Sequence, residues 1–189
     1  LNNRAPFPML VGFQEREHTN PTNYIVTPEH SYDNIENALN NLLVTLLASF
    51  PAGKAKFTFV DMQMQGGAGE IFRRLPNSIS NVILSDNDLR KKIASLKDMV
   101  SRVSVHTNNI VEFNEKAGSI THPYEFVIWR NYTGAERDLL HEADIMPLIK
   151  NGYRYGIYFI LLPSEEIDIS NTVLSNYVNE LIISDKEYQ

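Results

Sequence analysis

The residues with the greatest potential for chemistry lie between a buried strand and a long helix near the start of the chain. Residues 23–27 predict a short buried strand, and residues 35–47 predict an amphipathic helix. Such a unit binds nucleotide phosphate when the turn between them supplies glycines, a lysine and a hydroxyl, because backbone N–H groups wrap the phosphate. The turn at 28–34 contains no glycine, and no lysine follows it. The sequence therefore predicts the framework of a phosphate site without its chemistry.

Acidic side chains around this turn point the same way. Asp33 and Glu36 have capping-box spacing and would bond the free N–H groups at the start of the helix. Those groups are the donors that a phosphate would use. A triphosphate would also be repelled by the carboxylates of Glu29, Asp33 and Glu36. Each like-charge contact at ~4 Å costs about 4 kcal/mol at an effective dielectric of ~20. We therefore expect no magnesium–ATP binding of the usual kind and assign no cofactor.

The rest of the chain alternates short apolar runs with amphipathic stretches, which is typical of a sheet covered by helices on both faces. The predicted strands are 24–27, 57–60, 82–84, 125–129, 157–162 and 181–183. Two further helices are predicted over 88–105 and 137–151. Pro147 should kink or restart the last helix, and Gly152 should close it in a left-handed conformation. The predicted fold class is α/β, with a mostly parallel sheet.

Composition limits the remaining function classes. The chain has 189 residues, of which 43% are hydrophobic, and this suits one domain with a sizeable core. It contains no cysteine, which fits a cytoplasmic location, and no apolar run reaches the ~18–20 residues of a membrane span. The net charge of −6 argues against a globally basic nucleic-acid binder. The five histidines lack metal-ligand spacing, so no metal site is predicted.

Several short motifs follow one another in a fixed order. They are Asn-x-x-Leu-x-x-Leu-Leu at 40–47, Phe-Thr-Phe-Val-Asp at 57–61, Leu-Pro at 75–76, Asn-Ile-Val-Glu-Phe-Asn-Glu-Lys at 109–116, Pro-Tyr at 123–124 and Lys-Asn-Gly-Tyr-Arg-Tyr-Gly-Ile at 150–157. In order and spacing they resemble the FtsK/SpoIIIE family of RecA-like motor domains along nearly the whole chain. The resemblance implies a RecA-like P-loop NTPase fold with three αβα layers. It also implies a single domain over 1–189, as a fragment of a larger multi-domain protein.

The same resemblance indicates which positions have lost their chemistry. The family's Gly-Lys-Ser falls on Asn34, Ile35 and Glu36, and the leading glycine of its loop falls on Glu29. The Walker B aspartate and the catalytic glutamate fall on Arg130 and Asn131. Arg130 would repel magnesium, and an asparagine cannot act as a base near neutral pH. The resemblance thus implies degenerate Walker A and Walker B motifs and no catalytic residue.

The resulting hypothesis is a catalytically degenerate domain that serves as a docking or regulatory module of a DNA translocase or a type VII-like secretion motor. Its partners would be neighbouring motor domains or a substrate protein, with DNA bound through the parent assembly and a homo-hexamer as the full-length form. The alternative is an active ATP-dependent DNA translocase subunit with atypical nucleotide binding. A stand-alone accessory protein of defence or conjugation is a third possibility. Direct membrane insertion is not expected.

Docking would use the surface at the carboxyl ends of the strands, where α/β proteins bind ligands. We call this surface the rim, and it comprises residues 27–34, 61–69, 130–134 and 163–166. Trp129, Arg130 and Tyr132 are of the residue types enriched at binding hot spots. They are therefore the candidate interface residues.

Overall fold

The computed structural model describes residues 23–28, 33–63, 70–132, 142–163 and 173–183. The strands are β1 (Asn23–Pro28), β2 (Ala55–Val60), β3 (Ser80–Ile83), β4 (Tyr124–Tyr132), β5 (Ile157–Pro163) and β6 (Val178–Ile183). The α-helices are α1 (Asp33–Ser49), α2 (Asp86–Ser104), α3 (Ile110–Ala117) and α4 (Glu142–Asn151). Short 3₁₀ helices are η1 (Glu70–Arg74), η3 (Gly152–Tyr155) and η5 (Val173–Asn176). All six predicted strands are confirmed, with bounds that differ by up to three residues.

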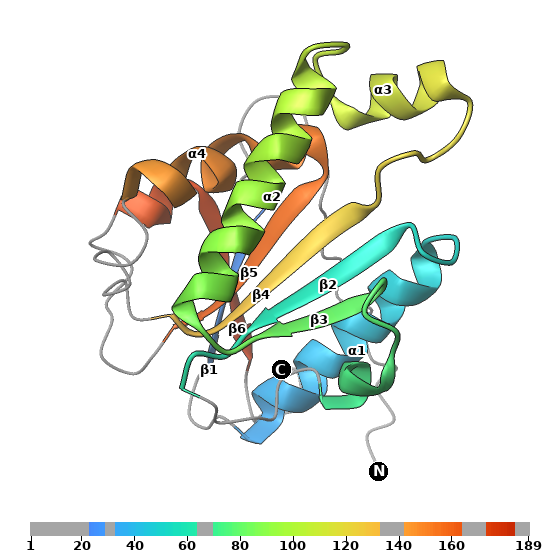
Figure 1. Cartoon of the computed structure of the whole chain (residues 1–189). Coiled ribbons are helices and arrows are strands. Elements are labelled where there is room, and N and C mark those ends of the chain that lie inside the picture. The colour runs from blue at the N-terminus through green and yellow to red at the C-terminus, as the bar shows by residue number, and fades with distance from the viewer. Residues whose placement is uncertain (1–22, 29–32, 64–69, 133–141, 164–172, 184–189) are drawn as a thin grey trace, which may run out of the picture.

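The strands form one sheet in the order β3-β2-β4-β5-β1-β6, and every neighbouring pair is parallel. Their carboxyl ends therefore meet at one edge of the sheet, at the lower left in Figure 1. Helices α2 and α4 cover one face, and α1 with η1 covers the other (Figure 1). The predicted three-layer αβα architecture is confirmed.

Two hydrophobic cores, one on each face, follow from the alternation of side chains along the strands. On β4, Val127 and Trp129 pack with α2 and α4, while Phe126 and Ile128 pack with α1 and η1. The continuous apolar runs of the central strands reflect this burial on both faces. Among the described helices, none combines the length and the apolar character needed to cross a bilayer.

Three details differ from the sequence-based expectations. Helix α4 runs through Pro147 to Asn151 as one helix, and residues 137–141 of the predicted helix lie outside the described residues. Gly152 is not left-handed; instead it begins η3, where a Cβ would lie 3.1 Å from the Ile157 carbonyl oxygen. The left-handed residue is Gly156, with a φ of 75°, so one extra 3₁₀ turn separates α4 from its closing glycine.

Helix α3 was not predicted. Asn109 caps its start by accepting a hydrogen bond from the Glu112 N–H at 2.9 Å, and Gly118 ends it with a φ of 68°. In Figure 1 it lies near the amino end of β4, away from the edge where the strands end. It therefore takes no part in the candidate site.

Candidate functional site

The candidate site lies where β2 and β4 end beside the start of α1. Alternation along β4 directs Trp129 toward the α2–α4 core, so the next side chain, Arg130, is directed to the opposite face. That face carries α1, whose first turn holds Glu36. The fold thus brings together two residues that are 94 positions apart in the sequence.

Arg130 and Glu36 form an ion pair in which the Arg130 Nη2 group donates to Glu36 Oε1. Their side chains are only 21% and 28% exposed. The second atoms of the two groups, Arg130 Nη1 and Glu36 Oε2, are buried and have no hydrogen-bond partner among the described residues. The contact is therefore a single charge-assisted hydrogen bond in a partly desolvated place, where such bonds are strongest.

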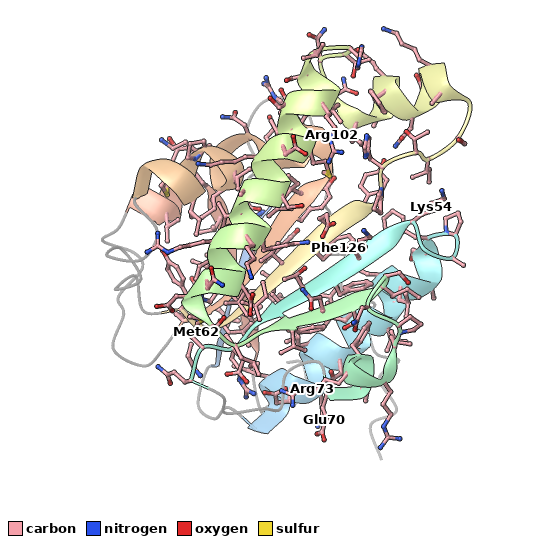
Figure 2. The ribbon with its side chains drawn as sticks, viewed as in Figure 1. Lys54, Met62, Glu70, Arg73, Arg102 and Phe126 are labelled. Carbon is pink, nitrogen blue, oxygen red and sulfur yellow. The ribbon has the colours of Figure 1, made fainter. Side chains whose placement is uncertain are left out.

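A second ion pair flanks the first. Asp61 follows β2 directly, is 5% exposed, and lies 3.9 Å from the Arg73 guanidinium of η1. Its backbone N–H donates to the Ile83 carbonyl at 3.0 Å, which fixes the residue at the end of the sheet. Figure 2 labels Met62 just beyond the end of β2 and Arg73 on η1. The described part of the site therefore carries charges of both signs, in two pairs.

The pKa of Glu36 is raised above its ordinary value of 4.5. Burial of the carboxylate is the largest cause, because it disfavours the charged form, and the negative charge of Asp61 acts in the same direction. The Arg130 charge and its hydrogen bond lower the pKa without cancelling the effect of burial. The ion pair therefore does not fully offset the burial of the Glu36 charge.

Ile35 occupies the α1 position immediately before Glu36 and is 2% exposed. It packs in the core formed by α1 and the facing side of the sheet, with Val26, Leu39 and Phe59 in the same cluster. Its side chain therefore faces the interior rather than the edge of the sheet. A cation at this position would have to leave the core to reach a ligand.

Asn131 adopts a left-handed backbone conformation, with a φ of 49°. It lies at a bulge, because Arg130 pairs with Leu162 and Tyr132 with Pro163 across β4 and β5. Asparagine tolerates this conformation better than most residues, since its short polar side chain can bond locally. The bulge interrupts the regular alternation of side chains directly after Arg130. Bulges of this kind often change the direction of a side chain beside a functional site.

Of the candidate interface residues, Trp129 does not reach the surface. Its side chain is 1% exposed, its ring lies 5.5 Å from the Tyr132 ring in an edge-on arrangement, and its indole N–H has no hydrogen-bond partner among the described residues. Tyr132 and Arg130 are partly exposed. Trp129 therefore supports the rim from below, and only the other two can touch a partner directly.

Other predicted positions are described in part. Glu29 lies outside the described residues, and for Asp33 and Asn34 only the backbone is described, as the start of α1. The capping box is thus untested, although the Glu36 carboxylate has Arg130 as a partner. The rim is described only at 27–28, 33–34, 61–63, 130–132 and 163. Within the described ranges, no three His, Asp or Glu side chains gather as a metal site would require.

Comparison with solved structures identifies the fold. The cytoplasmic domain of EssC matches 86% of this chain over 33% of its own length, with a TM-score of 0.67 and 15% identity. ATPases 2 and 3 of EccC from Thermomonospora curvata, solved with a signal sequence peptide, match 84% of the chain over 30% of their length, with a TM-score of 0.60 and 16% identity. The conjugation coupling protein TcpA of pCW3, solved as a monomer with ATPγS, matches 84% over 47%, with a TM-score of 0.60 and 16% identity.

The fold is that of a RecA-like P-loop ATPase domain. EssC, EccC and TcpA are motors of the FtsK/SpoIIIE family, the family that the sequence motifs resemble. The resemblance is therefore confirmed for the fold, which is as far as identities of 15–16% reach. The chain spans about one third of the EssC and EccC chains that it matches, at 33% and 30%. No protein-family model and no curated protein matches it in sequence.

Sequence reasoning named Glu36 and Arg130 separately and did not pair them. The resemblance assigns them to two positions that hold the same magnesium ion in a working P-loop domain. Opposite charges at two such positions were the signal for direct contact. Arg73 is not among the candidate residues of the sequence analysis, because its proximity to Asp61 depends on how η1 packs on the sheet.

Proposed function

We propose that this chain is a catalytically silent FtsK/SpoIIIE-type domain that docks within a larger motor for DNA translocation or type VII-like secretion. The observation that carries the proposal is the Glu36–Arg130 ion pair. In a working domain, the hydroxyl at the first position and the aspartate at the second hold magnesium. Here a carboxylate and a guanidinium bond each other, so a metal ion would have to displace a cation of like charge.

The position of the P-loop lysine supports the same conclusion. Ile35 is buried in the α1 core, so this position contributes apolar packing and no charge for the nucleotide's phosphates. At the position assigned to the catalytic glutamate, Asn131 offers an amide, which cannot take a proton from water near neutral pH. The site would therefore lack the lysine that binds phosphate, the side chains that hold magnesium and the carboxylate that activates the attacking water.

Docking is the role that such a fold retains once catalysis is lost. The described rim presents Tyr132 and Arg130 above the buried Trp129, and aromatic and arginine side chains are enriched at binding hot spots. Arg73 adds a second guanidinium that is 42% exposed. We propose that these residues contact a neighbouring motor domain or a substrate protein where an active domain would bind nucleotide.

The structural neighbours support a proposal for the protein in which this domain works. EssC is represented by its cytoplasmic domain and EccC by tandem ATPases of a type VII secretion system, and each is longer than this chain. We propose that residues 1–189 form one domain of a cytoplasmic, multi-domain motor that assembles as a hexamer. The rival function is an active DNA translocase subunit that binds nucleotide in an atypical way.

The experiment measures docking and hydrolysis with the same preparations. Binding of the domain to the adjacent ATPase domains of its motor is measured by light scattering, for wild type, Tyr132→Ala and Tyr155→Ala. Tyr155 is a matched control, because it is also half-buried but lies before β5, at the opposite end of the sheet. We expect Tyr132→Ala alone to weaken binding about ten-fold or more, as loss of a hot spot does.

Two results would contradict the proposal. Equal binding by all three proteins would show that the rim is not the docking surface. Hydrolysis of ATP by the isolated domain, stimulated by duplex DNA, would instead establish the rival function of an active translocase subunit.

A further inference from the structure

The Glu36–Arg130 pair joins two parts of the fold that lie far apart in the chain. Glu36 belongs to the first turn of α1, and Arg130 lies near the end of β4. The cluster of α1 with the sheet includes apolar side chains of both elements, such as Leu39 and Ile128, but these lie deeper than the ion pair. The ion pair is thus a polar link at the outer end of an apolar layer.

In a working P-loop domain, the same two segments are connected through a ligand. The P-loop hydroxyl at the start of the helix and the Walker B aspartate after the strand each bind the magnesium that accompanies the nucleotide. This magnesium-mediated link is made only while the ion and the nucleotide are bound. In this chain the link is made of two side chains that are always present.

Neighbouring features hold the link in place. The bulge at Asn131 follows Arg130 directly, and Arg130 is paired in register with Leu162 of β5, which fixes its backbone on that side of the strand. Asp61 is held by its hydrogen bond to β3 and by Arg73, and its negative charge lies close enough to act on Glu36. Glu36, the partner of Arg130, thus lies near a second carboxylate, that of Asp61.

We propose that the Glu36–Arg130 ion pair is an internal replacement for magnesium nucleotide, which holds the start of α1 against the end of β4 at all times. This inference rests on the proposed function, and it adds a regulatory property to it. The start of α1 and the end of β4 then keep one arrangement whether or not nucleotide is present, so docking on them does not follow the ATP cycle of the motor. A domain of this kind acts as a constant partner beside domains that open and close.

Hydrogen exchange of the amides at residues 37–41, in the second turn of α1, tests the inference at neutral pH. Amides around Leu96 in α2 report global stability. The variants are Glu36→Gln, Arg130→Met and the charge swap Glu36→Arg with Arg130→Glu. Lys91→Met is the matched control, because it removes the exposed ion pair of Lys91 with Asp88 at 3.1 Å on α2. Each protein is measured with and without magnesium and ATP.

We expect exchange in α1 to be about ten-fold faster in Arg130→Met, which leaves the buried Glu36 carboxylate unpaired, and less affected in Glu36→Gln, which removes that charge. Exchange in α2 and in the control should be unchanged, and the swap should restore most of the protection. If Arg130→Met does not fold, Arg130→Gln, which keeps a polar side chain at this position, carries the test. Three results would overturn the inference and leave the proposed function standing. They are equal acceleration of exchange in α1 and α2, no acceleration in α1, and a charge swap whose α1 amides are no better protected than those of the arginine variant. Slower exchange of the wild type with magnesium and ATP would overturn the proposed function itself.

Discussion

Replacing Ile35 by lysine restores the residue that a P-loop needs, yet it should damage the fold and create no activity. Ile35 is 2% exposed and packs in the core beneath α1. An ammonium at a fully buried site can lose as many as ~5 pKa units, which would leave the side chain largely neutral at pH 7. Removing its proton, from an unfolded pKa of ~10.4, costs about 1.4 kcal/mol for each pH unit, or about 5 kcal/mol.

That cost is comparable with the whole stability of a small domain, which is about 5–15 kcal/mol. We expect the midpoint of thermal unfolding to fall by roughly 10–20 °C, at 2–4 °C per kcal/mol for a chain of this size. The sign of the pH dependence is fixed as well. Because the folded pKa lies below the unfolded pKa, the variant gains stability as the pH rises from 7 toward 10.

Urea denaturation at pH 7 and pH 9.5 measures the effect, and two variants serve as controls. Ile35→Met keeps the site apolar and should cost less than ~1.5 kcal/mol, while Asn41→Lys places the same charge on the exposed side of α1. Catalytic turnover of ATP is measured in parallel. A stable Ile35→Lys protein within ~1 kcal/mol of wild type, or one that hydrolyses ATP, would refute the reasoning, because the lysine would then reach an intact site.

Three further predictions concern the fold and the site. Asn23 is buried, donates hydrogen bonds to two backbone carbonyls at 2.6 and 3.3 Å, and accepts one from a backbone N–H at 2.9 Å. Asn23→Leu should therefore lower the free energy of unfolding in urea by about 2–5 kcal/mol. A loss below ~1 kcal/mol would show that these hydrogen bonds are dispensable. Glu125 is buried and pairs at 2.7 Å with the partly buried Lys92, so Lys92→Met should cost about 3–5 kcal/mol, because it leaves the Glu125 carboxylate unpaired. Adding Glu125→Leu should recover most of this loss, and equal stability of the single and double variants would contradict the prediction. Because the folded pKa of Glu36 is raised above 4.5, the free energy of unfolding should fall as the pH rises through the window above 4.5, and a Glu36→Gln variant that shows the same slope would rule out this source.

Much of the fold could be predicted because its signals are local. The strands are short apolar runs bounded by polar residues, and the face of α1 that packs on the sheet repeats with helical spacing. Helix α3 was missed, although Asn109, Glu112 and Gly118 carry the signals of a capped start and a left-handed end. Eight residues with a partly exposed apolar face are too short to stand out by periodicity.

The site was predictable only as separate positions. Glu36 and Arg130 are 94 residues apart, and their contact depends on a parallel sheet that brings the end of β4 beside the start of α1. The burial of Trp129 follows from strand alternation, which places neighbouring side chains on opposite faces. Residue type alone indicated a hot spot there, and only the packing of α2 and α4 shows that the indole is covered.

Calorimetric titration of the wild-type chain with magnesium and ATP tests the central claim most directly, namely that the side chains of Glu36, Arg130 and Ile35 close the nucleotide site. The ion pair and the buried isoleucine predict no measurable heat of binding at millimolar nucleotide. A dissociation constant below ~100 μM, equivalent to about 5.5 kcal/mol of binding free energy, would contradict the account.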